Sequence, residues 1–228
     1  MPILVVPSPA NSYAIQRTVD FYSIKSPPAG IDSLEALMAK WWNWWEDHPT
    51  QIAHNWPVCL KQNEMVGNRS VLFLANPAYS DEKNTNARNQ NCEISSNQIL
   101  YLTLYPGECS AFEAKESSVS KLLECAIDSN RVIKLNQVKV DGKDVSSNII
   151  SQRTTRPFNF VIPSVNVDAA EPSTLGKVNP SMAENYYMFF KPLPAGHHTI
   201  EAELIRQPLQ SDQPVEQHTT KWNVNVSP

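Results

Sequence analysis

The side chains best suited to acid–base or metal chemistry are five histidines and a few carboxylates late in the chain. The histidines are His48, His54, His197, His198 and His218. Their spacing matches neither an H-E-x-x-H pair nor another zinc-binding pattern. The sequence therefore predicts no metal site and no cofactor.

Three carboxylates could serve a glycoside hydrolase: Asp168, Glu171 and Glu184. Such an enzyme needs two acids at a fixed separation across the scissile bond, and the spacing of these three along the chain does not establish that separation. We interpret them as solvated loop acids. The chain also lacks a G-x-S-x-G elbow, a phosphate-binding loop and a G-x-G-x-x-G motif. We therefore assign no catalytic residue and favour a non-enzymatic protein.

His197 and His198 are neighbours in a segment that reads as a strand, so their side chains should point to opposite faces of a sheet. For His198 we expect a structural hydrogen bond at the start of the strand rather than a ligand contact. His197 is then a candidate ligand-binding residue.

Four of the five residues from 41 to 45 are tryptophans. They fall in a predicted helix at about 33–47, whose apolar side chains recur at helical spacing on one face. Packing against a sheet is the favoured interpretation, and the alternatives are stacking on a sugar ring and lying at a membrane interface. Trp42 lies off the apolar stripe and is a surface candidate. Trp42 and Trp45 are the two proposed ligand-binding tryptophans.

The four cysteines, Cys59, Cys92, Cys109 and Cys125, are even in number and include no C-x-x-C pair. This favours two disulfides formed in an oxidising compartment over a zinc site or free cytosolic thiols. Three connectivities can be drawn. The preferred pairs are Cys59–Cys92 and Cys109–Cys125.

Short alternating segments predict a mainly β protein with a second short helix at about 117–127. Asp141-Gly142 predicts a tight hairpin turn, and Pro194-Ala195-Gly196 predicts another hairpin between strands 186–190 and 199–205. Strands and helices do not alternate, which favours an antiparallel β-sandwich, Ig-like or jelly-roll-like, with two appended helices. We expect one domain over 1–228, in which residues 1–30 form an N-terminal strand or extension.

The chain has 228 residues and a net charge of -4, and it contains no basic cluster. Nucleic acid is therefore not an expected partner. No apolar run is long enough to span a bilayer, and prolines interrupt the first residues. We expect that a signal peptide has been removed, that Met1 comes from recombinant expression, and that the protein is secreted or periplasmic.

The sequence resembles a widespread family of exported bacterial and archaeal proteins that has no assigned activity. The matching stretches are Trp41–Trp45, Cys59-Leu60-Lys61-Gln62, Val71–Ala75, Cys92, Val140–Val145 and Tyr186–Ile200, which contains Pro-Leu-Pro-Ala-Gly-His-His-Thr-Ile. The Cys59 step is one residue shorter than the family spacing, and glycines are fewer than usual. The resemblance implies export and a β-rich fold, and it transfers no catalytic residue.

Three function classes remain from the sequence. The favoured one is an exported, disulfide-stabilised, non-catalytic binding module that recognises a surface, a glycan or a protein. The alternatives are a secreted hydrolase acting on an extracellular polymer and a structural component of an envelope or appendage.

Overall fold

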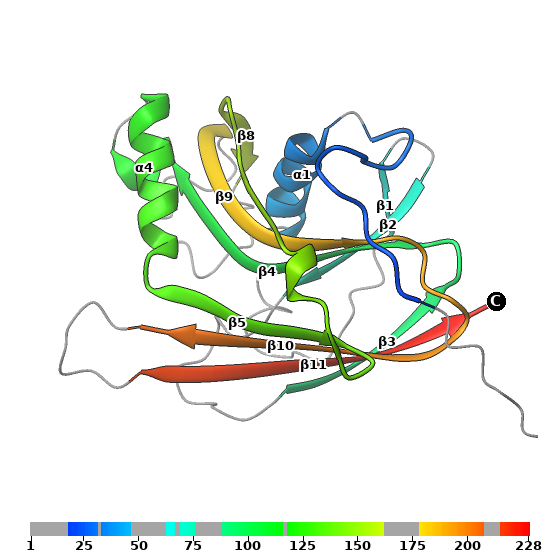
Figure 1. Cartoon of the computed structure of the whole chain (residues 1–228). Helices are drawn as coiled ribbons and strands as arrows, with labels where there is room; N and C mark the ends of the chain where they lie inside the picture. The colour runs from blue at the N-terminus through cyan, green and yellow to red at the C-terminus, as the bar shows by residue number, and fades with distance from the viewer. Residues whose placement is uncertain are drawn as a thin grey trace, which may run out of the picture.

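The computed structural model describes residues 18–31, 33–46, 63–66, 69–75, 88–115, 118–161, 178–207 and 215–228. Strands dominate this part of the chain and form two sheets that face each other (Figure 1). The predicted mainly β sandwich with short helices is confirmed.

The first sheet has the strand order β1-β2-β4-β9-β7, with β8 also paired to β9. Its strands are β1 (Asn63–Val66), β2 (Arg69–Ala75), β4 (Ile99–Ser110), β7 (Ile150–Arg153), β8 (Phe158–Val161) and β9 (Val178–Phe190). The second sheet has the order β3-β11-β10-β5-β6. Its strands are β3 (Arg88–Ser95), β5 (Ile133–Val140), β6 (Lys143–Asp144), β10 (Gly196–Arg206) and β11 (Glu216–Ser227).

Each sheet contains one parallel pair, which corrects the expectation of a purely antiparallel sandwich. In the first sheet β2 runs parallel to β4, with Val71 opposite Ile99. In the second sheet β3 runs parallel to β11. Two parallel strands cannot be joined by a tight turn. The turn residues from which we predicted the sandwich therefore gave no indication of parallel pairing.

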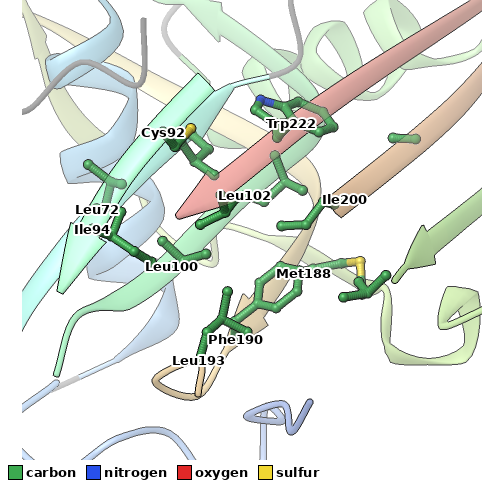
Figure 2. Packing of buried hydrophobic residues seen from close by; sticks show 14 of the residues in the cluster. Leu72, Cys92, Ile94, Leu100, Leu102, Met188, Phe190, Leu193, Ile200 and Trp222 are labelled. Atoms are coloured by element: carbon green, nitrogen blue, oxygen red, sulfur yellow. The ribbon is translucent and has the colours of Figure 1, made fainter. Parts of the chain in front are cut away.

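The core between the sheets is built from alternate residues of facing strands. Leu100, Leu102 and Phe190 of the first sheet pack against Ile200 and Trp222 of the second (Figure 2). Trp222 is fully buried. Because successive strand residues point to opposite faces, this contact also fixes which residues of β10 and β11 point outward.

Helix α1 (Leu34–Glu46) covers the opposite face of the first sheet (Figure 1). The Ser33 hydroxyl accepts a hydrogen bond from the Ala36 N–H at 3.0 Å and so caps its first turn. Trp41 is fully buried in a cluster with Phe73 and Tyr101 of that sheet. The predicted helix and its packing against a sheet are confirmed.

Helix α4 (Val119–Asn130) is the second predicted helix, extended by three residues beyond 127. It packs on β4 and β9, and the Cys109–Cys125 disulfide joins it to β4. Asn130 of α4 bonds Glu184 of β9, whereas Trp42 of α1 bonds the next residue of that strand, Asn185. Because successive strand residues point to opposite faces, the two helices lie on opposite faces of the first sheet.

The Cys109–Cys125 prediction is confirmed by that bond. Cys92 is also disulfide-bonded. Its predicted partner, Cys59, lies outside the described residues, so the pair Cys59–Cys92 stays a prediction.

A short helix that we did not predict, α3 (Ala111–Ala114), follows Cys109 and begins with a capping box between Ser110 and Glu113.

The two predicted hairpins have different outcomes. The Asp141-Gly142 turn is confirmed: both residues have positive φ angles, 50° and 74°, and they join β5 to β6. The hairpin around Pro194-Ala195-Gly196 is wrong, because β9 and β10 lie in different sheets. That segment carries the chain from one layer to the other, and β10 pairs with β11 and β5 instead.

The N-terminal segment is described from residue 18. It runs beside the end of β9, where Phe21 forms an antiparallel bridge with Phe190 and the Tyr22 N–H donates to the Phe189 carbonyl at 2.8 Å. Residues 1–17 of the expected N-terminal strand or extension lie outside the described part.

Candidate functional site

The site begins with the alternation of buried and outward residues along β10. His198, Ile200, Ala202 and Leu204 are buried toward the other sheet. His197, Thr199, Glu201 and Glu203 therefore point outward. The exposed His197, which we predicted as a ligand-binding residue, stands at the start of this outward row.

We call the outer side of the second sheet the polar sheet face. Pairing of β10 with β11 and β5, and of β11 with β3, aligns the outward residues of four strands. They are Asn91 and Glu93 of β3, Gln217, Thr219, Lys221, Asn223 and Asn225 of β11, His197, Thr199, Glu201, Glu203 and Ile205 of β10, and Lys134, Asn136, Gln137 and Lys139 of β5. On the edge strand β6, Asp144 pairs with Lys139 and accepts a hydrogen bond from Gln137, so it lies on the same face.

One hydrogen-bonded row crosses three strands at one end of this face. Nδ1 of His197 lies 2.8 Å from Oδ1 of Asn225. The Asn225 amide nitrogen in turn donates to Oε1 of Glu93, also at 2.8 Å. Register places these residues directly opposite one another, with His197 facing Asn225 and Asn225 facing Glu93.

Further cross-strand contacts hold the other outward side chains. Asn223 donates to Asn91 at 3.1 Å, and Nζ of Lys221 lies 3.1 Å from a Glu201 oxygen. Glu203 accepts hydrogen bonds from Asn136 at 2.7 Å and from Gln217. Mutual bonding restricts the rotamers of these side chains and so fixes the pattern of donors and acceptors that a partner meets.

His198 has the structural role that we predicted. Its Nδ1 lies 2.7 Å from Oδ2 of Asp141, and its Nε2 lies 2.9 Å from the Pro194 carbonyl oxygen. Oδ1 of Asp141 accepts from the Thr199 N–H at 2.8 Å. These bonds join the β5–β6 turn to the start of β10, directly beneath His197.

The two candidate tryptophans, Trp42 and Trp45, both pack in the cluster between α1 and the first sheet. Trp42 is only 8% exposed, which corrects our expectation of a surface residue. Its indole N–H donates to Oδ1 of Asn185 at 3.2 Å, and its ring meets Phe160 of β8 edge-on. Trp45 is partly buried and stacks on Trp41. A ligand-binding role for Trp42 or Trp45 stays a prediction, and neither lies on the strands that form the polar sheet face.

Of the three candidate acids, only Glu184 lies in the described part of the chain. Glu184 is only 2% exposed, and its carboxylate accepts from Nε of Arg153 at 2.7 Å and from Asn130 at 3.1 Å. It is therefore a buried, paired carboxylate rather than the solvated loop acid we expected. Asp168 and Glu171 lie outside the described residues. Within the described part of the chain, no group of three His, Cys, Asp or Glu side chains could hold a metal ion.

Sequence reasoning missed Glu93, Asn223 and Asn225. Glu93 and Asn225 are 132 residues apart and meet only because β3 pairs with the last strand. The alternation Trp222-Asn223-Val224-Asn225-Val226 was a usable signal, since it places two amides on the face opposite the buried apolar residues.

No family model and no curated protein match this chain. Among solved structures, it is similar to the cysteine protease inhibitor EhICP2 from Entamoeba histolytica, with 13% identity, 69% of this chain and 95% of that chain covered, and a TM-score of 0.27. It is also similar to the inclusion body protein PixA from Burkholderia cenocepacia, with 7% identity, coverage of 59% and 63%, and a TM-score of 0.22.

A third similar structure is that of Amebosin, with 10% identity, coverage of 68% and 96%, and a TM-score of 0.21. Identities and TM-scores of this size carry no argument about what this protein does.

In the described part of the chain, no helix is both long enough and apolar enough to cross a membrane.

Proposed function

We propose that this protein is an exported, disulfide-stabilised, non-catalytic binding module whose polar sheet face binds a neutral, hydroxyl-rich polymer, that is, a glycan. The observation that carries the proposal is the row formed by His197, Asn225 and Glu93, in which an exposed imidazole is held by two further side chains.

The composition of the face supports a glycan over a protein partner. Cores of protein–protein interfaces are enriched in aromatic residues, methionine and arginine and depleted in lysine and glutamate. The polar sheet face has none of the enriched types and several of the depleted ones. Amide, carboxylate, imidazole and ammonium groups are instead suited to hydroxyls, which both donate and accept hydrogen bonds.

The charge on the face supports a neutral ligand. Its three lysines, Lys134, Lys139 and Lys221, are offset by four carboxylates, those of Glu93, Glu201, Glu203 and Asp144. Lys221 and Glu201 are paired directly. A polyanion such as nucleic acid would need a surplus of positive charge, and this surface does not supply it.

The disulfides support export. Structural disulfides persist in oxidising compartments and are rare in the cytosol, and the Cys109–Cys125 bond joins a helix to a central strand. We accordingly propose a secreted or periplasmic location.

The proposal is tested by mixing the oxidised protein with insoluble cellulose, chitin and xylan and measuring how much protein each pellet removes from solution. We expect at least one polymer to bind the protein, and Asn225→Ala to weaken that binding. Asn159→Ala is the matched control, because Asn159 is also an exposed strand residue but lies on β8 of the first sheet. Equal binding by both variants, or no binding to any polymer, would refute the proposal.

A further inference from the structure

We infer that Glu93 is a positioning residue that, through Asn225, holds the neutral ring of His197 with its proton on Nδ1, so that Nε2 accepts a hydrogen bond from the ligand. The part of this inference that concerns the ligand rests on the proposed function. The part that concerns the ring can be measured without any ligand.

The first step is the orientation of the Asn225 amide. An ionised carboxylate can only accept hydrogen bonds, so the group 2.8 Å from Oε1 of Glu93 must be the amide nitrogen of Asn225. The carbonyl oxygen of that amide is then turned toward His197.

The second step is the position of the imidazole proton. The Asn225 carbonyl oxygen also can only accept, and it lies 2.8 Å from Nδ1 of His197. Nδ1 must therefore carry a proton. In a neutral ring the other nitrogen, Nε2, then has a lone pair and no hydrogen.

The third step is where Nε2 is placed. His197 is exposed at the end of the polar sheet face, and among the described residues no hydrogen bond to its Nε2 is found. The ring thus offers a fixed acceptor at the surface. A hydroxyl or N–H group of a ligand can donate to it, whereas a carbonyl or a carboxylate cannot.

The same row explains why an acid serves better than an amide at position 93. A glutamine there could present either its oxygen or its nitrogen to Asn225. The Asn225 amide would then be free to turn, and it could present its nitrogen to His197 and so favour a proton on Nε2. Glu93 removes that second arrangement.

The test is nitrogen NMR of the His197 ring in the free, oxidised protein, at a pH where the ring is neutral. We expect the proton on Nδ1 in the wild type and a mixture of both tautomers in Glu93→Gln. Glu201→Gln is the matched control, since it removes the same charge from the same face but leaves the row intact.

A double variant distinguishes positioning from a general effect on folding. Glu93→Gln combined with Asn225→Asp exchanges the amide and the carboxylate and keeps the net charge. The carboxylate introduced at 225 would accept from both neighbours, so we expect the Nδ1 proton to return. Binding to the polymer found above should fall by about 2- to 10-fold in Glu93→Gln, as expected for one hydrogen bond, and recover in the double variant.

A wild-type ring with its proton on Nε2, or a tautomer that Glu93→Gln leaves unchanged, would overturn the positioning role whether or not a glycan binds. A ring with its proton on Nδ1 in a protein that binds no polymer would overturn the proposed function and leave the positioning role standing.

Discussion

His197 and His198 are adjacent in β10 and face opposite sides of the second sheet. His198 is 8% exposed and is held by Asp141 and the Pro194 carbonyl. His197 points outward and bonds Asn225. A one-residue step along a strand therefore separates a side chain that joins two elements of the fold from one that lies on the polar sheet face.

Asp141 should be important for stability because it bonds both the His198 ring and the Thr199 N–H. We expect Asp141→Ala to lower the free energy of unfolding by about 1–3 kcal/mol, since it takes a hydrogen-bond partner from the buried His198 ring and another from the Thr199 N–H. Asp141→Asn should cost less, because asparagine tolerates the positive φ at this position and can still bond Thr199. Urea denaturation measures both, and an equal loss in the two variants would contradict this account.

The Cys109–Cys125 bond closes a loop with a sequence separation of 16. Replacing both cysteines with serine should lower the free energy of unfolding by about 3 kcal/mol, because the unfolded chain regains conformational entropy. Guanidinium denaturation of the variant and the oxidised wild type measures the difference. Equal midpoints and slopes in the two proteins would show that the bond contributes nothing to stability.

Gly107 of β4 lies directly against helix α4. A Cβ atom built there would lie 2.5 Å from the Ala126 carbonyl oxygen and 2.5 Å from Oδ1 of Asn130. Gly107→Ala should therefore displace the helix and destabilise the protein by about 1–3 kcal/mol. Val119→Ala is the control, since Val119 is 43% exposed on the same helix. Thermal unfolding compares them, and a Gly107→Ala protein as stable as the control would argue against this packing.

Asp144 is expected to titrate at unusually low pH. Its carboxylate accepts from the Ser146 hydroxyl at 2.6 Å, the Ser146 N–H at 2.9 Å and Gln137 at 2.8 Å. These bonds, led by that of the Ser146 hydroxyl, lower the pKa of Asp144 from 3.8 to about 2.

A carboxyl whose pKa is lower in the folded state stabilises the protein above its unfolded value. The stabilisation is therefore present above pH 3.8 and is lost as the pH falls through about 2. Ser146→Ala should raise the pKa of Asp144 toward 3.8, as seen by carboxyl-carbon NMR. Ser129→Ala, a change remote from this turn, should leave that pKa where it is. A pKa that does not move in Ser146→Ala would refute the assignment of its cause.

Local patterns in the sequence predicted the local parts of the structure. The helical stripe from Leu34 to Trp44, the Asp141-Gly142 turn and the 109–125 disulfide all join residues that are close in the chain. Each depends on a property of a short stretch of sequence: side-chain periodicity, a positive φ, or a short loop closed by two cysteines.

The parts that sequence reasoning missed depend on distant pairing. Trp42 lies off the helical stripe, yet it is buried because Phe160 of β8 covers it. Glu184 is an acid held in the interior because Arg153 and Asn130 reach it from other elements. The Glu93 and Asn225 contact needs the parallel register of β3 and β11, and a single sequence gives no direct signal of that register.

The most direct test of the account is an NMR titration of the isotope-labelled, oxidised protein with soluble oligosaccharides cut from whichever polymer it binds. The account predicts that backbone and side-chain signals of His197, Asn223 and Asn225 shift most, and that signals from α1, including Trp45, do not move. Shifts that instead cluster on α1, or no shifts at any concentration of any oligosaccharide, would contradict the assignment of the polar sheet face as the binding site.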